Sequence, residues 1–284
     1  MSQVEDAHLR EELCIKISRM SPRKLEFESR FLFTITFITA FIIGCNNTGT
    51  GVTATQTTAS KIQTPTKLST ISPPPATPET IPFEFPGNID PVKFYLFYLH
   101  GKIIEDQGIP AFSPDFGEYQ YREILEALSR HGLAVISKVR PKGTEVVEYA
   151  RKVSEQIETL LEAGVPANQV TVVGASKGAG IAIYISNFLK NKDINYVIMG
   201  ICHPGEVRRL IEEGVFLTGN VLSIYDSADG YAGSCQELFS FSAGKGISIY
   251  DEIVLDLGAG HGVLYQPLEE WIIPAVRWAN TTSP

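Results

Sequence analysis

A serine with a glycine two residues away on each side stands at a predicted strand-to-helix junction. Gly174-Ala175-Ser176-Lys177-Gly178 directly follows the apolar run 169–173 and precedes a helical stretch. A sharp turn at such a junction points the serine hydroxyl outward from a strained backbone, and the small flanking residues let the strand and the helix pack closely. The pattern indicates a nucleophile, provided that a base and an orienting acid lie nearby.

Two later loops contain a carboxylate and an imidazole. The predicted strand 220–225 is followed by a turn with Asp226 and Asp229, and the predicted strand 249–255 by a glycine-rich segment with His261. The carboxyl ends of parallel strands meet at one edge of a sheet, where ligands bind. The serine, an aspartate and the histidine are therefore expected to converge there.

Strands and helices alternate from residue 89 onward. Strand-like runs are expected at 93–99, 133–138, 169–173, 195–201, 220–225 and 249–255. Segment 145–163 places apolar residues on one face at helical spacing, and a last helix is expected over 264–278. The alternation predicts an α/β fold, with a mostly parallel sheet covered by helices on both faces.

Residues 93–278 resemble an α/β-hydrolase domain of the esterase/lipase type. The resemblance rests on the pentapeptide around Ser176, on the chain order serine, acid, histidine, and on His100-Gly101 after the first strand. It implies an α/β-hydrolase fold, and the length of about 196 residues from 89 to 284 leads us to expect a small or absent cap. The resemblance also implies that Ser176 is the nucleophile and His261 the general base. Asp229 is preferred to Asp226 as the acid, because the family's aspartate stands a few residues beyond its strand.

The resemblance further implies an oxyanion hole formed by the backbone N–H groups of Lys102 and Lys177. The implied activity is that of a serine hydrolase, which cleaves a carboxylic ester or a related small acyl compound through an acyl-enzyme intermediate. A non-catalytic protein of this fold that binds a ligand or partner at the cell surface is one alternative, and a peptidase of the same fold is another. No cofactor is implied, and the five histidines lack the paired spacing of a metal site.

The substrate is not encoded in any recognisable motif. The loop 103–116 is expected to cover the site. Glu105, Asp106 and Arg140 are expected either to line the entrance of the site or to lie on a solvated loop surface. Cys202 and Cys235 follow neighbouring predicted strands, so they either form a disulfide or remain buried thiols.

The N-terminal region has the pattern of an export signal. Basic residues precede the uncharged apolar run 31–43, which ends in Gly44-Cys45. This ending resembles the cleavage site of bacterial lipoproteins, so residues 1–44 are expected to be the signal peptide and Cys45 the lipidated first residue. A short transmembrane anchor is the alternative, and translation starts at either Met1 or Met20.

Residues 45–88 are rich in threonine, serine and proline and are expected to form a disordered tether to a domain at 89–284. The protein would then be exported and attached to the membrane by its lipid. A net charge of −8 indicates no nucleic-acid partner. The oligomeric state stays open.

Overall fold

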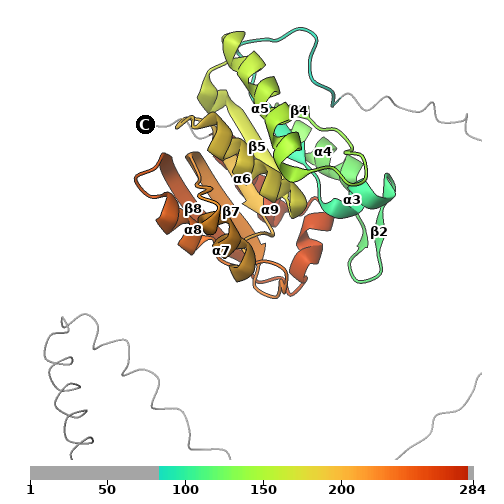
Figure 1. Ribbon diagram of the computed structural model, residues 1–284. Helices are drawn as coiled ribbons and strands as arrows, with labels where there is room; N and C mark the ends of the chain where they lie inside the picture. Colours follow the sequence, from blue (N-terminus) through green and yellow to red (C-terminus); the bar gives the residue numbers. More distant parts are fainter. Residues whose placement is uncertain (1–82, 281–284) are drawn as a thin grey trace, which may run out of the picture. The chain divides into compact units, whose positions relative to one another are not determined.

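The computed structural model describes residues 83–280 (Figure 1). The expected signal peptide 1–44, the expected lipidation site Cys45 and residues 45–82 of the expected tether lie outside this range. Among the described residues, no helix combines the length and the apolar character needed to cross a membrane.

Six parallel strands form the central sheet in the spatial order β4-β1-β5-β6-β7-β8. Their bounds are β1 Tyr95–Leu99, β4 Ala134–Ile136, β5 Val170–Ala175, β6 Asn195–Met199, β7 Gly219–Asp226 and β8 Ile247–Leu255. Each strand coincides with or overlaps one of the six predicted runs. The predicted parallel sheet is confirmed.

Helices cover both faces of this sheet (Figure 1). One face packs against α5 (Val146–Glu162), α6 (Lys177–Leu189), α7 (Pro204–Glu212) and α8 (Gln236–Ser242), and the other against α3 (Lys102–Gln107), α4 (Tyr121–Ser129) and α9 (Glu269–Ala279). Alternate residues of β1 enter the two cores, Phe97 on the first side and Tyr98 on the second. Burial on both faces explains the nearly continuous apolar runs in the sequence.

The region after β8 differs from the prediction of one helix over 264–278. Residues Gly260–Tyr265 form a 3-10 helix, η3, and α9 begins only at Glu269. Pro267 explains the break, because a proline disfavours helical geometry in the residue before it. Gln266 is accordingly extended, with φ −130° and ψ 151°.

The packed part of the domain begins before residue 89. Phe83 is buried, and its carbonyl oxygen accepts a hydrogen bond from the Ser137 N–H over 2.7 Å. The expected loop 103–116 is also more ordered than predicted. It contains most of α3, and it continues into a hairpin of β2 (Phe112–Ser113) and β3 (Gly117–Glu118).

The sheet has a topological switch point between β1 and β5. The chain passes from β1 to β4 on one side and then returns to place β5 on the other side of β1. Leu99, which ends β1, lies opposite Gly174 near the end of β5. Ligands of open parallel sheets bind outside the carboxyl ends of the strands at such a point. The loops that follow β1 and β5 are therefore the natural walls of a site.

Candidate active site

Ser176 occupies a strained turn between β5 and α6. Its backbone has φ 53° and ψ −118°, a combination that non-glycine residues rarely adopt and that occurs mostly at functional sites. The Ser176 N–H donates to the carbonyl oxygen of Met199, at the end of β6, over 2.8 Å. This bond ties the turn to the neighbouring strand.

The glycines on either side of the serine are required by close packing. A Cβ atom at Gly178 would overlap the carbonyl group of Leu99 at the end of β1. A Cβ atom at Gly174 would overlap the carbonyl oxygen of Gly178 and come within 2.6 Å of the Ala179 nitrogen. The glycine spacing thus lets α6 approach the ends of two central strands.

Two helix N-termini meet beside this serine. Lys102 is the first residue of α3, and Lys177 is the first residue of α6. The N–H groups in the first turn of a helix have no acceptor within the helix, so they are available to an anion. Gly101, which precedes α3, lies beside the serine, since a Cβ atom on it would make an ordinary contact of 3.8 Å with the Ser176 Cβ.

His261 is hydrogen-bonded to Asp229. The Nδ1 atom of His261, in η3, lies 2.7 Å from the Oδ2 atom of Asp229, in the loop after β7. The other carboxylate oxygen of Asp229 accepts the N–H of Tyr231 over 2.8 Å, which fixes its orientation. A proton on Nδ1 donated to Asp229 leaves Nε2 free to accept one.

Asp226 has a different environment, although it lies only three residues away. Its carboxylate accepts backbone N–H groups from Ala228, Leu257 and Gly260 over 2.9 to 3.0 Å. Burial alone would raise the pKa of Asp226, but these N–H groups outweigh it and hold the pKa below the usual value. Asp226 therefore joins the acid loop to the histidine loop and leaves Asp229 to contact the imidazole.

Ser176 and His261 line one cavity of about 260 Å³. Aromatic rings form much of its wall, from Phe116, Tyr119, Tyr231 and Tyr265. The centroids of the Phe116 and Tyr231 rings lie 6.2 and 5.5 Å from that of the His261 imidazole. These aromatic walls could not be predicted from the sequence, because the positions of the four rings follow no motif.

Glu105 and Arg140 lie inside the protein, contrary to both sequence-based expectations. Their side chains are 1% and 0% exposed, and they form an ion pair that also includes Lys177. Burial would raise the pKa of Glu105, but Lys177 and Arg140 outweigh it and lower the pKa. Asp106 differs from these two, as its side chain is 31% exposed and pairs with Lys102.

His100 shapes the loop after β1. Its Nδ1 atom bonds the Gly101 carbonyl oxygen over 2.8 Å, and its Nε2 atom accepts the Arg140 N–H over 3.0 Å. Burial, with a smaller contribution from the Arg140 charge, lowers the pKa of His100 to about 3. The imidazole is thus a neutral structural group.

Cys202 and Cys235 form a disulfide, which settles the alternative that the sequence left open. Cys202 follows β6, and Cys235 immediately precedes α8. The crosslink therefore anchors the far end of the loop that carries Asp229.

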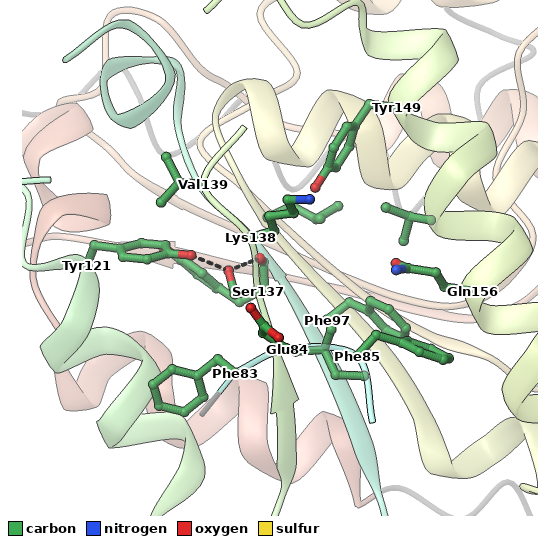
Figure 2. A pocket seen from close by; sticks show the side chains of 14 residues that line it. Phe83, Glu84, Phe85, Phe97, Tyr121, Ser137, Lys138, Val139, Tyr149 and Gln156 are labelled. Carbon is green, nitrogen blue, oxygen red and sulfur yellow. Dashed lines mark hydrogen bonds between the residues drawn. The ribbon is translucent and has the colours of Figure 1, made fainter. Parts of the chain in front are cut away.

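A larger cavity, of about 430 Å³, lies beside β4 and α5 (Figure 2). Neither Ser176 nor His261 lines it. Two of its polar side chains are hydrogen-bonded, as the Tyr121 hydroxyl lies 2.7 Å from Ser137 Oγ, which donates to the Tyr98 carbonyl oxygen. The volume of a cavity therefore does not identify the candidate active site, because the smaller cavity contains Ser176 and His261.

Known proteins resemble this chain only distantly. No protein-family model and no curated protein matches the sequence. The similar solved structures include SOBER1 of Arabidopsis thaliana, with 13% identity and a TM-score of 0.44 over 65% of this chain and 99% of that one. A predicted CIB-like hydrolase from Thermoplasma acidophilum has 16% identity and a TM-score of 0.45 over 68% and 89% of the two chains. The RedJ thioesterase of Streptomyces coelicolor has 12% identity and a TM-score of 0.41 over 68% and 88%.

The class of fold is defined by the chain itself. Its parallel sheet, the strained serine between β5 and α6, and the chain order Ser176, Asp229, His261 are the features of the α/β-hydrolase fold. The predicted fold class is confirmed.

Proposed function

We propose that this protein is a serine hydrolase that cleaves a carboxylic ester or a related acyl compound. The observation that carries the proposal is the hydrogen bond of His261 to Asp229, together with the cavity that His261 and Ser176 both line. A nucleophile, a base and an orienting acid, far apart in sequence, are the minimum set for acyl transfer through a covalent intermediate.

In this mechanism Ser176 Oγ attacks the substrate carbonyl carbon while His261 Nε2 takes the hydroxyl proton. Asp229 holds the imidazole in the required tautomer and stabilises its charged form. The N–H groups of Lys102 and Lys177 donate to the oxyanion. His261 then returns the proton to the leaving alkoxide, and the resulting acyl-enzyme is hydrolysed by a water molecule that His261 deprotonates.

A fluorophosphonate probe tests this proposal, because it reacts with activated serines. The protein should be labelled and should hydrolyse a p-nitrophenyl ester, and Ser176→Ala should abolish both. Ser227→Ala is the matched control, because Ser227 is an exposed serine whose hydroxyl bonds Asp256. Labelling that persists in Ser176→Ala would refute the assignment of the nucleophile. A binding protein of the same fold would take neither probe nor ester.

We further propose that the acyl group is short. The cavity of about 260 Å³ is smaller than the roughly 300–1,000 Å³ typical of sites for larger ligands. Its aromatic walls favour an uncharged acyl chain. In a series of p-nitrophenyl esters from acetate to laurate, kcat/KM should peak at acetate or butyrate. A maximum at laurate would contradict this size limit.

Export and lipid attachment at Cys45 are also proposed. The basic residues and the apolar run before Cys45 support them. The Cys202–Cys235 disulfide gives independent support, because disulfides persist mainly in oxidising compartments. Metabolic labelling with an alkyne fatty acid in a bacterial host should mark the membrane-bound protein, and Cys45→Ala should lose the label. A labelled Cys45→Ala protein would contradict the site.

A further inference from the structure

Glu105 connects the two residues whose N–H groups are the proposed oxyanion donors. It lies on α3, three residues after Lys102 and within the same helical turn. Its Oε1 atom accepts a hydrogen bond from the Nζ atom of Lys177 over 2.7 Å. A carboxylate on the helix that carries one donor thus holds the side chain of the residue that carries the other.

The rest of the cluster leaves this contact little freedom. Glu105 Oε1 also accepts the N–H groups of Gly143 and Thr144 over 3.1 and 3.0 Å, and Lys177 Nζ donates to the Thr144 carbonyl oxygen over 2.6 Å. Glu105 Oε2 accepts from Arg140 Nε over 3.4 Å. The carboxylate is therefore bound at both oxygens, by the segment 140–144 and by Lys177 at the start of α6.

Arg140 extends the cluster to the loop that precedes Lys102. Its guanidinium donates to the carbonyl oxygen of His100, and its backbone N–H donates to the His100 ring. The segment that leads into α3 is thus fixed at its start by Arg140 and at Glu105 by Lys177. His100, before the proposed donor Lys102, and Glu105, after it, are therefore both held by the same group of charges.

A buried ion cluster is weak evidence for a gain in stability, because desolvation offsets much of the attraction between the charges. Its position is more informative. Stabilisation of an oxyanion depends on donors that are fixed in place before the reaction, and small displacements of such groups reduce the rate strongly. A cluster that joins both donors would supply that rigidity.

On the basis of the proposed function, we infer that Glu105 is a positioning residue. By binding the Lys177 ammonium, it fixes the position of the Lys102 N–H group relative to that of the Lys177 N–H group. Glu105 does not line the cavity that contains Ser176 and His261. It acts through the helix that bears it and through the side chain that it binds.

Two variants weaken this connection from opposite ends. Glu105→Gln removes the carboxylate charge, and Lys177→Met removes the ammonium but keeps the backbone N–H. Removal of one oxyanion donor lowers kcat by about 10²- to 10³-fold. Misplacement of a donor should have a smaller effect, of about 10- to 100-fold, with KM nearly unchanged. Glu126→Gln is the control, because Glu126 is exposed on α4 and its carboxylate pairs with Arg130 rather than with either donor residue.

The decisive measurement is the inhibition constant of an aryl trifluoromethyl ketone. This ketone forms a hemiketal with the serine, and the hemiketal oxygen occupies the oxyanion hole. Its inhibition constant should rise in parallel with the fall in kcat for both variants, and the affinity for the carboxylic acid product should not change. A purely structural role would not produce that difference, and the control variant should change neither value.

Each outcome separates the inference from the proposed function. Wild-type protein without esterase activity would overturn both. Active wild-type protein, together with folded variants that keep their kcat and ketone affinity, would overturn the positioning role alone. A change confined to KM would also overturn it. If Glu105→Gln does not fold, Lys177→Met decides, because Arg140 still neutralises Glu105 in that variant.

Discussion

The two halves of the candidate site are held in place by different interactions. The serine half lies at the ends of β1 and β5, where glycines let backbones touch and the buried Glu105 cluster joins two helix termini. The histidine half consists of the loops after β7 and β8. Backbone N–H groups that donate to Asp226 organise these loops, and the Cys202–Cys235 disulfide anchors one of them.

This difference indicates how each half responds to change. Close packing of strands and helices tolerates almost no added volume, so enlarging a packed glycine of the serine half should remove activity together with the fold. Hydrogen bonds in loops are removed one at a time, so the histidine half should lose activity and stability separately. Substitutions chosen in pairs test both expectations.

Gly178→Ala should have the largest effect on the fold. The new Cβ atom would overlap the Leu99 carbonyl group, and backbone atoms there have little room to move. We expect the loss of soluble protein or a destabilisation of about 3 kcal/mol or more. Chemical denaturation measures this value.

Gly180→Ala is the matched control for that substitution, two residues along the same helix. A Cβ atom at Gly180 meets no atom within 4 Å. Alanine is also the better helix former by up to about 1 kcal/mol. The control should therefore be neutral or stabilising. If both variants unfolded equally, close packing at Gly178 would not be the cause.

Asp229→Asn and Asp226→Asn separate catalysis from loop stability within the histidine half. Asparagine at 229 would favour the wrong imidazole tautomer, so kcat should fall by about 10³- to 10⁴-fold, with the free energy of unfolding lowered by about 1 kcal/mol or less. Asparagine at 226 would turn a donor toward backbone N–H groups. That variant should lose about 1 to 3 kcal/mol of stability and less activity.

Ester turnover and urea unfolding of both aspartate variants decide between the two roles. A reversed result, with Asp226→Asn the less active variant and Asp229→Asn the less stable one, would assign the acid to Asp226.

The strands and the turn of the serine half could be predicted from the sequence, but the charged cluster that holds its helix termini could not. Apolar runs located all six strands, because strands buried on both faces must be apolar throughout. The need for glycines at 174 and 178 located the turn. The buried ion cluster of Glu105, Arg140 and Lys177 was missed, since Glu105 and Arg140 are far apart in sequence and charged residues are usually exposed.

The histidine half was predicted with less detail. The position of His261 after the last strand followed from the strand pattern. The environments that distinguish Asp226 from Asp229 depend on N–H groups from a loop about thirty residues downstream, which no local pattern encodes. Pro267, which divides the expected last helix, was readable from the sequence.

The disulfide should contribute to the stability of the histidine half but not to its chemistry. It links residues 33 positions apart, and closure of loops of this size typically contributes about 2 to 4 kcal/mol. The double variant Cys202→Ser/Cys235→Ser should unfold at a lower urea concentration than wild type. At urea concentrations well below its unfolding midpoint, its kcat should equal that of wild type. A reductant should lower the urea midpoint of the wild-type protein and leave that of the double variant unchanged. A large loss of kcat in the folded double variant would mean that the crosslink positions Asp229.

Acid should weaken the serine half through His100. Its pKa of about 3 in the folded protein lies below the usual value of 6.5. The unfolded chain therefore binds the extra proton between these values. The contribution to stability is complete above pH of about 6.5, and it falls by at most about 1.4 kcal/mol per pH unit toward pH 3.

His100→Gln isolates this effect, because glutamine keeps a donor and an acceptor but does not titrate. Urea unfolding at pH 7, 6 and 5 should show a falling stability for wild type and a flatter profile for the variant. This range lies above the pKa values of Glu105 and Asp226, which are both lowered, so neither carboxylate titrates in the folded protein there. Equal slopes for the two proteins would show that the imidazole is not the group responsible.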